Sequence, residues 1–254
     1  MRLTVLGRWS PYPPAAGACP GYLVETGDQL LLLDCGPGVL ANLQQVASVF
    51  ALTGVVITHL HPDHVLDLFA LKQALEFGRF PAKAPPLRFF GPPGAAEILP
   101  AWMGEADQAS FRARFQFFPI RGGTAARLGA VVLRFGETAH SLPCFAVRVE
   151  GEGGVLTYSA DTGPSAAVAT LAEGADLFLC ENTLPPGEEA RAELMGHLSA
   201  GQAGHMAARA NARRLVLTHF FAPAGDYAEE AERAAAKEFG GQVAIARELD
   251  RHDI

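Results

Sequence analysis

The stretch Thr58-His59-Leu60-His61-Pro62-Asp63-His64 places three imidazoles and a carboxylate within six residues, directly after the apolar run Val55-Val56-Ile57. Histidine is the commonest metal ligand in proteins, and carboxylates complete sites for hard cations. Because strand side chains alternate, His59 and His61 point to the same side of an extended segment. Asp63 and His64 follow where the chain turns into a helix, so the stretch predicts a metal site. A histidine-rich polar turn without a metal is the alternative.

The composition predicts a globular protein with no general attraction to polyanions. The chain has 254 residues, 49% of them hydrophobic, and a formal net charge of −7. This length suits one α/β domain with a large core, and the charge does not favour nucleic acid or an anionic membrane. No stretch approaches the roughly 20 apolar residues that cross a bilayer. The scattered cysteines indicate reduced thiols and a cytoplasmic protein: Cys19, Cys35, Cys144 and Cys180.

Short apolar runs separated by turn residues predict ten strands. These are Leu3–Leu6, Gly21–Glu25, Leu30–Asp34, Gly54–Thr58, Leu87–Phe90, Val131–Phe135, Phe145–Val149, Val155–Ser159, Asp176–Cys180 and Leu215–Thr218. Four helices are expected at Asp63–Phe77, Ser165–Ala172, Ser199–Asn211 and Asp226–Phe239, the third opened by a capping box. Strands mixed with helices indicate a layered α/β or α+β sandwich. The short Pro/Gly-rich stretches are predicted loops, so residues 1–254 are expected to form one domain: Ser10–Pro20, Pro81–Pro86 and Gly91–Gly94.

Further polar residues follow predicted strands in the same way as the histidine stretch. His140, Asp161, His219 and Asp34 each lie at or just after the end of an apolar run. Loops beyond strand ends are the usual place for site residues on a rigid scaffold. The segments 54–60 and 214–220 both end a buried-looking strand in Thr-His, which indicates two related halves that each deliver a histidine.

The order His-x-His-x-Asp-His, then a lone His, a lone Asp and a final His resembles the metallo-β-lactamase superfamily. Within it, the chain is most similar to the ribonuclease Z branch over roughly residues 1–222. Four segments carry the finer match: Leu33-Asp34-Cys35-Gly36, Tyr158-Ser159-Ala160-Asp161-Thr162-Gly163, the run from Ala175 to Thr183, and His197-Leu198-Ser199-Ala200-Gly201-Gln202-Ala203 leading to Leu217-Thr218-His219-Phe220.

The resemblance implies a four-layer αββα sandwich with two divalent metal ions at one edge, Zn²⁺ or alternatively Mn²⁺. By position, His59, His61 and His140 would hold one metal. Asp63, His64 and His219 would hold the second, and Asp161 would bridge the two. Asp34 would orient the histidine loop without binding a metal. A hydroxide bridging the metals would then attack the substrate, with Asp63 predicted to be catalytic as well as a ligand.

His197 and Glu181 resemble the pair that acts beside the metals in ribonuclease Z. His197 would contact the scissile phosphate or protonate the leaving oxygen, and Glu181 would orient it. This pair favours phosphodiester chemistry over thioester or lactone chemistry. The alternative is that His197 merely precedes the helix capped by Ser199.

Two departures from the ribonuclease Z pattern favour a small substrate. His140 and Asp161 are too close in the chain for the long arm that grips transfer RNA, and Gly36-Pro37-Gly38-Val39 replaces the usual Gly-Glu-Gly-Thr. We therefore expect a short-form metal-dependent hydrolase acting on small, cyclic or short nucleotide phosphodiesters, with folded transfer RNA an unlikely partner. A lactonase or thioesterase, and a ribonuclease Z-like RNA endonuclease, are the alternatives. The resemblance also implies a homodimer. No membrane partner is expected, because of the net charge and the absence of a long apolar stretch.

Overall fold

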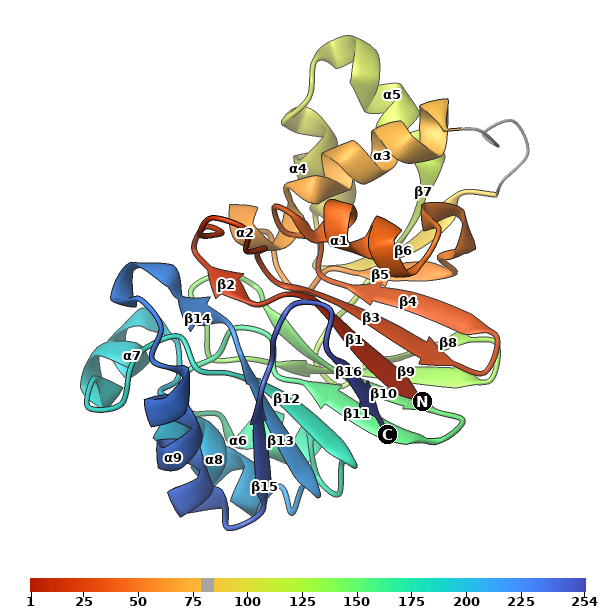
Figure 1. Ribbon diagram of the computed structural model, residues 1–254. Helices are drawn as coiled ribbons and strands as arrows, with labels where there is room; N and C mark the ends of the chain where they lie inside the picture. Colours follow the sequence, from red (N-terminus) through yellow and green to blue (C-terminus); the bar gives the residue numbers. More distant parts are fainter. Residues whose placement is uncertain (79–84) are drawn as a thin grey trace.

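The computed structural model describes residues 1–78 and 85–254, and it contains two seven-stranded mixed sheets that face each other (Figure 1). The first sheet has the order β16 (Arg251–Asp253), β1 (Arg2–Gly7), β3 (Gly21–Thr26), β4 (Gln29–Leu33), β5 (Gly54–Val56), β6 (Leu87–Gly91) and β7 (Phe115–Pro119). The second has the order β15 (Gln242–Ile245), β13 (Arg214–Thr218), β12 (Leu177–Glu181), β11 (Gly154–Tyr158), β10 (Phe145–Gly151), β9 (Val131–Glu137) and β8 (Ala125–Leu128).

Helices cover the outer face of each sheet (Figure 1). The first sheet carries α1 (Val39–Val46), α2 (Pro62–Val65), α3 (Asp67–Phe77), α4 (Ala95–Ala101) and α5 (Glu105–Arg114). The second half carries α6 (Ala166–Leu171), α7 (Glu189–Met195), α8 (Ala200–Arg209) and α9 (Ala228–Phe239). Short 3₁₀ helices span Val49–Ala51 and Ala222–Ala224. No helix in the described ranges has the length and apolar character needed to cross a membrane.

Strand alternation produces three hydrophobic layers. Along β4, Leu31 and Leu33 join the central cluster between the sheets, whereas Leu32 packs outward against the helices. Successive strand side chains point to opposite faces, so a continuous apolar run fills both layers. A third cluster lies under α8 and α9 and contains Phe178 and Leu217. The αββα sandwich expected from the sequence is therefore confirmed.

Two strand pairings tie the ends of the chain to the opposite half. β16 crosses to pair antiparallel with β1, which brings the two termini side by side (Figure 1). The short strands β2 (Trp9–Ser10) and β14 (Phe220–Phe221) pair in parallel next to His219. Both pairings link segments that are far apart in the sequence, and the second one joins the two sides of the candidate site.

All ten predicted strands are present, with boundary shifts of one or two residues. The helix predicted over Asp63–Phe77 is wrong in one respect, because it is divided into α2 and α3 at Leu66. The amide of Asp67 donates to the carbonyl of Cys35 at 3.0 Å, which replaces the bond that would continue the helix. The predicted capping box of Ser199 and Gln202 is present. The predicted loop at Pro81–Pro86 lies largely outside the described residues.

Candidate metal centre

The predicted site residues come together at the carboxyl ends of strands in both sheets. β4 leads into Asp34, β5 into His59, β11 into Asp161 and β13 into His219. The carboxyl ends of parallel strands are the usual location of ligand sites in open α/β sheets. Each sheet thus contributes some of the side chains, and the site forms where the two sheets face each other.

Three of these strand-end segments turn through left-handed backbone. The φ angles are 55° at Asp34, 53° at Ala160 and 60° at His219. Non-glycine residues with such angles are uncommon. They occur mainly at functional sites, where the surrounding contacts hold the backbone in a conformation that it would otherwise avoid. The turn redirects the chain immediately beyond each strand, which brings Asp34, Asp161 and His219 toward one another.

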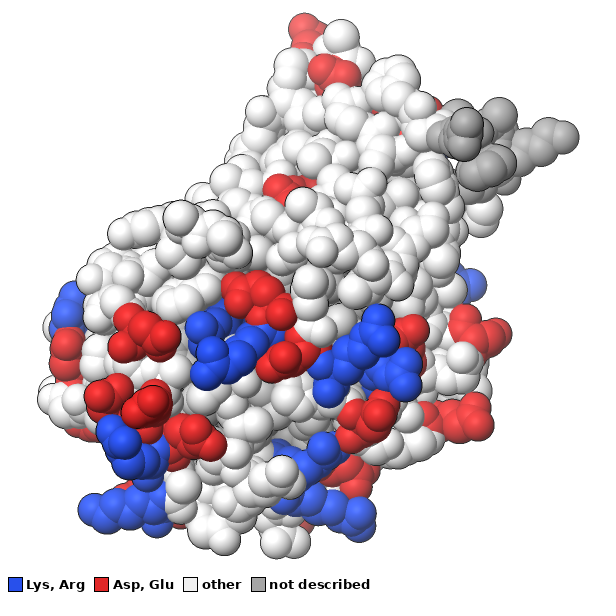
Figure 2. Space-filling model, in the orientation of Figure 1, with Lys and Arg blue, Asp and Glu red and all other residues white. Residues whose placement is uncertain are grey.

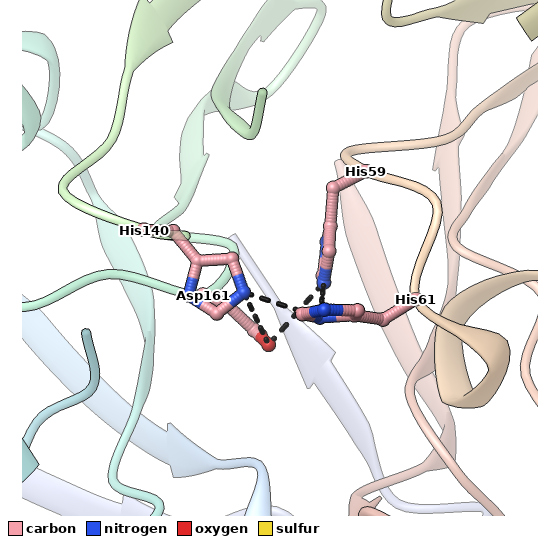
Figure 3. Close-up of side chains that lie close together, drawn as sticks. All are labelled: His59, His61, His140 and Asp161. Atoms are coloured by element: carbon pink, nitrogen blue, oxygen red, sulfur yellow. Dashed lines mark hydrogen bonds and ion pairs between the residues drawn. The ribbon is translucent and has the colours of Figure 1, made fainter. Parts of the chain in front are cut away.

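The first group of converging side chains consists of His59, His61, His140 and Asp161 (Figure 3). Nε2 of His59 lies 3.0 Å from Nδ1 of His61, and Nε2 of His140 lies 3.2 Å from the same nitrogen. Figure 3 shows His59 and His61 approaching from one side and His140 and Asp161 from the other. The ring nitrogens therefore converge on a shared point, as ligands of one ion do.

The second group consists of Asp63, His64 and His219, all of them buried. Nε2 of His64 lies 3.1 Å from Nε2 of His219, and each of these nitrogens is 3.7 Å from Oδ2 of Asp63. Ser10 donates to that same carboxylate oxygen at 3.0 Å. The β2–β14 pairing therefore contributes to placing Asp63, because Ser10 belongs to β2.

Asp161 lies between the two groups and divides its carboxylate between them. Oδ2 is 3.4 Å from Nε2 of His59, whereas Oδ1 is 3.4 Å from Nε2 of His64 and 3.2 Å from Nε2 of His219. The residue is 2% exposed, and Oδ1 has no hydrogen-bond partner among the described residues. A buried carboxylate oxygen without a donor is costly, and a cation on each side would satisfy it.

The donor set fits two divalent cations. The Nδ1 atoms of four histidines already meet oxygen atoms: Thr58 Oγ1 for His59, Asp34 for His64, the Gly196 carbonyl for His140 and Thr183 Oγ1 for His219. Such bonds fix the tautomer and leave Nε2 free to bind a metal. Imidazoles with carboxylates suit Zn²⁺ and related divalent ions.

Asp34 lies beneath the histidines and contacts the Nδ1 side of His64, so it is not among the converging ligand atoms of either group. Its carboxylate accepts from the Thr58 amide at 2.8 Å, from the Tyr158 hydroxyl at 3.0 Å and from Nδ1 of His64 at 2.8 Å. The adjoining Gly36 packs against the α2 backbone, since a Cβ there would lie 1.8 Å from the Asp63 carbonyl oxygen. The loop that carries Asp34 is therefore placed to orient the histidine segment, the role that the resemblance implies.

His197 and Glu181 also lie together beside the second group. Nδ1 of His197 is 2.9 Å from Oε1 of Glu181, and the carboxylate is fully buried. The amides of Thr162 and Leu198 donate to the same carboxylate at 2.7 and 3.2 Å. Ligand atoms of Asp161, His197 and His219 lie within 4.8 Å of one another. His197 is therefore held at the site and does more than precede the α8 cap.

The electrostatics of the site follow from burial and close charges. Burial would raise the pKa of Asp63, but the nearby His64 and His219 hold it well below its usual range. Burial lowers the pKa of His59 well below its ordinary value and so favours the neutral form that a metal needs. Burial also opposes the charged form of His64, but the carboxylates of Asp161, Asp34 and Asp63 raise its pKa well above the ordinary value, so a metal bound there would displace its proton. Burial likewise opposes the charged form of His197, yet the adjacent Glu181 carboxylate raises its pKa to about 9.

The hydroxyls that hold these ligands were not predicted from the sequence. Thr58, Thr183, Tyr158 and Ser10 each bond a ligand or the carboxylate behind it. Thr58, Thr183 and Tyr158 lie within quoted motifs, so their position next to the ligands was the available signal. Nothing in the sequence distinguishes Ser10 from other loop serines, because its contact depends on the β2–β14 pairing.

Comparison with known proteins places this arrangement in a family. A family model described as a β-lactamase superfamily domain matches residues 30–220, and the chain belongs to this family. Fold and family together define a metal-dependent hydrolase of the metallo-β-lactamase type.

Individual relatives agree with the ribonuclease Z-like resemblance. The chain is 30% identical over 275 residues to a ribonuclease Z of Mycobacterium bovis, covering 100% of this chain and 98% of the relative. It is 27% identical to a probable metallo-hydrolase, YhfI of Bacillus subtilis, over 97% of both chains. The crystal structure of YhfI matches with a TM-score of 0.86 over 99% of this chain and 98% of that one, at 26% identity. Human short-form tRNase Z shares the fold, with a TM-score of 0.80, 21% identity and coverage of 100% and 99%.

Proposed function

We propose that this hydrolase cleaves small or short phosphodiesters at a centre that holds two divalent metal ions. His59, His61 and His140 would hold one ion, Asp63, His64 and His219 the other, and Asp161 would bridge them. Zn²⁺ is the ion we favour, with Mn²⁺ as the alternative. When bound, the ions would lower the pKa of a water molecule and offset negative charge on the reacting group.

The observation that carries the phosphodiester assignment is the His197–Glu181 pair. Nδ1 of His197 is 2.9 Å from Glu181, which leaves Nε2 without a hydrogen-bond partner among the described residues. The ring lies within ligand distance of Asp161 and His219. A group there is placed to donate a proton to a leaving oxygen. Asp63 is held ionised by its histidine neighbours, which suits a metal ligand, and its catalytic role would be to orient the attacking water as a hydrogen-bond acceptor.

The charge around the site supports a small substrate. Lys and Arg are absent from the following segments, which carry or adjoin the site residues: 10–20, 58–71, 138–147, 159–172, 181–190, 192–208 and 215–232. Arg8 lies just before the first of them, over the Phe220 ring, but it is buried and 3.7 Å from Glu248. Arg191 interrupts them but pairs with Glu188 at 2.6 Å. On the face shown in Figure 2, basic and acidic groups are interspersed and form no basic patch. A polyanion bound through many phosphates needs such a patch.

The compact connection between His140 and Asp161 also supports a small substrate. β10 and β11 form a hairpin closed at the Gly151–Gly154 pair, and Asp161 follows β11 directly. An arm that grips transfer RNA would be inserted in this part of the chain. The names of relatives such as the Mycobacterium bovis ribonuclease Z keep an RNA endonuclease as the second candidate.

The remaining expectations extend this proposal. Residues 1–254 form one domain, because β16 and the central cluster draw on both halves. Four buried, unpaired cysteines fit a cytoplasmic location. Dimerisation rests on the resemblance alone and stays a prediction that sedimentation would check.

The test compares a substrate panel for wild type, His197→Ala and His205→Ala. His205 is an exposed histidine on α8 and serves as the matched control. We expect His197→Ala to reduce turnover of cyclic nucleotides and aryl phosphodiesters by about 10²–10⁴-fold with metal content retained, and His205→Ala to leave it unchanged. Turnover of lactones or thioesters that is indifferent to His197→Ala would favour the carboxyl-ester alternative instead.

A further inference from the structure

The hydroxyl of Thr183 lies at the junction of three polar side chains. Its Oγ1 is 2.5 Å from Oε2 of Glu181, 2.8 Å from Nδ1 of His219 and 3.1 Å from Nδ1 of His197. Thr183 itself is 1% exposed. A hydroxyl has one proton to donate and two lone pairs that accept, so these contacts use its full capacity.

The proton positions in this junction follow from the carboxylate. An ionised carboxylate only accepts, so Thr183 donates to Glu181 and must accept from His219. The proton of His219 is thereby placed on Nδ1, and its Nε2 faces Oδ1 of Asp161 at 3.2 Å with a free lone pair. Among the described residues, Thr183 is the side chain that receives the hydrogen bond of His219 Nδ1.

The carboxylate at the other end of this chain of bonds is firmly anchored. Backbone amides of Thr162 and Leu198 donate to Glu181 at 2.7 and 3.2 Å, and the residue is completely buried. Through Thr183, the ring of His219 is therefore held in place by Glu181, a buried residue at the end of β12.

The same arrangement recurs in the first half of the molecule. Thr58 Oγ1 lies 3.1 Å from Nδ1 of His59 and donates to the buried carboxylate of Asp34 at 2.9 Å. The repeated Thr-His of the sequence does not predict this correspondence, because Thr218 instead bonds the Tyr22 hydroxyl at 2.8 Å. The threonine that serves His219 comes from the neighbouring strand.

We propose that Thr183 is a positioning residue, which fixes the tautomer and orientation of His219 for metal binding and connects it to Glu181 and His197. Removing its hydroxyl leaves the Nδ1 proton of His219 without an acceptor and allows the ring to turn or to change tautomer. Loss of such a partner behind a metal-bound histidine costs about 10–100-fold in metal affinity. This role of Thr183 rests on the proposed binding of metal by His219, and it is the same whichever ester the enzyme hydrolyses.

The experiment measures Co²⁺ and Zn²⁺ binding to the full chain by chelator competition, together with the visible spectrum of bound Co²⁺. The variants are Thr183→Val and Thr183→Ser, and the control is Thr157→Val. Thr157 is equally buried, but its Oγ1 has no hydrogen-bond partner among the described residues. The control therefore makes the same change of side chain without breaking a bond.

We expect Thr183→Val to weaken one equivalent of metal by about 10–100-fold and to change the Co²⁺ spectrum, while Thr183→Ser and Thr157→Val resemble wild type. Unchanged binding of both equivalents in Thr183→Val, or equal loss in Thr183→Ser, would overturn the proposal. If Thr183→Val does not fold, Thr183→Ala takes its place. If neither Thr183→Val nor Thr183→Ala folds while Thr157→Val does, the positioning role would also be overturned, because the Thr183 hydroxyl would then be needed for folding itself.

Discussion

Oδ1 of Asp161 lies 3.2 Å from Nε2 of His219, and the other oxygen of the same carboxylate faces His59. The two histidines come from opposite sheets, so this one side chain joins the two halves of the site. The oxygen of Asp161 that has no hydrogen-bond partner among the described residues and the converging histidine nitrogens are the features that support the proposal of two bound cations.

Asp161→Ala is expected to reduce bound metal from two equivalents per chain to one or fewer, since both ion positions lose a ligand. Metal analysis after dialysis would measure this. Asp176→Ala provides the control, because Asp176 is a carboxylate in the second half that bonds the Val155 amide and Arg213 away from the site. Two equivalents in Asp161→Ala would exclude a bridging role.

Asp34→Ala is expected to weaken metal binding by about 10–100-fold although Asp34 is not a proposed ligand. The substitution removes the acceptor of His64 Nδ1 and of the Thr58 and Tyr158 hydroxyls. Chelator competition against wild type would quantify the effect. An affinity equal to that of wild type in a folded variant would show that the carboxylate does not orient the histidine loop.

Gly36→Ala is expected to destabilise the fold by about 1–3 kcal/mol, as over-packing of a tight contact does. The added Cβ would lie 1.8 Å from the carbonyl oxygen of Asp63, so α2 must move and carry its ligands with it. Gly104→Ala is the control, because nothing lies within 4 Å of a Cβ at that position. In Gly36→Ala, the free energy of unfolding from chemical denaturation and the metal affinity should both fall. If both values equal those of wild type, Gly36 does not approach the Asp63 carbonyl as closely as described.

Removal of metal is expected to lower the thermal midpoint in proportion to the ions lost. Binding to the folded state alone stabilises it by about 2.7 kcal/mol for each site at a free-ion concentration 100-fold above Kd. Without cations, the buried carboxylate of Asp161 also loses the partners it needs. Thermal unfolding with and without chelator, followed by readdition of Zn²⁺, would measure the effect, and an identical midpoint in both conditions would count against a built metal site.

Activity on a small phosphodiester is expected to change little with salt. Of the described arginines beside the site, Arg191 is paired with Glu188, and Arg8, whose guanidinium lies over the Phe220 ring, is buried and lies 3.7 Å from Glu248. By contrast, a protein that makes 6–10 phosphate contacts loses about 10³–10⁵ in affinity between 50 and 200 mM salt. Titration of kcat/KM and of short RNA binding against salt would separate the two cases, and a steep RNA slope would support the endonuclease alternative.

Much of this architecture was predictable because it depends on local patterns. Buried parallel strands read as continuous apolar runs, and the Ser199 capping box marked the start of α8. The peripheral strands β15 and β16 were missed, since their side chains are half-buried or exposed and only their pairing defines them. The break at Leu66 depends on the Cys35 carbonyl, which lies far away in the sequence.

In the candidate site, too, the features that depend on local sequence were predictable and those that depend on contacts between distant segments were not. The ligand residues were recognisable from their order along the chain, and the structure brings all seven together. The hydroxyls behind them were not assigned, because Thr58, Thr183 and Ser10 gain their importance from contacts between segments. The repeated Thr-His does mark a histidine delivered from the end of a strand in each half. It does not reveal the hydroxyl behind that histidine, since Thr218 bonds Tyr22 whereas Thr58 contacts His59.

The most direct test of the central claim is metal analysis of the purified chain combined with hydrolysis of an aryl phosphodiester by wild type and His64→Ala. We predict two equivalents of divalent metal in active wild type, and loss of one equivalent together with the activity in a folded His64→Ala. Full hydrolysis by a chain that contains no metal, or by a His64→Ala variant that retains both ions, would contradict the account.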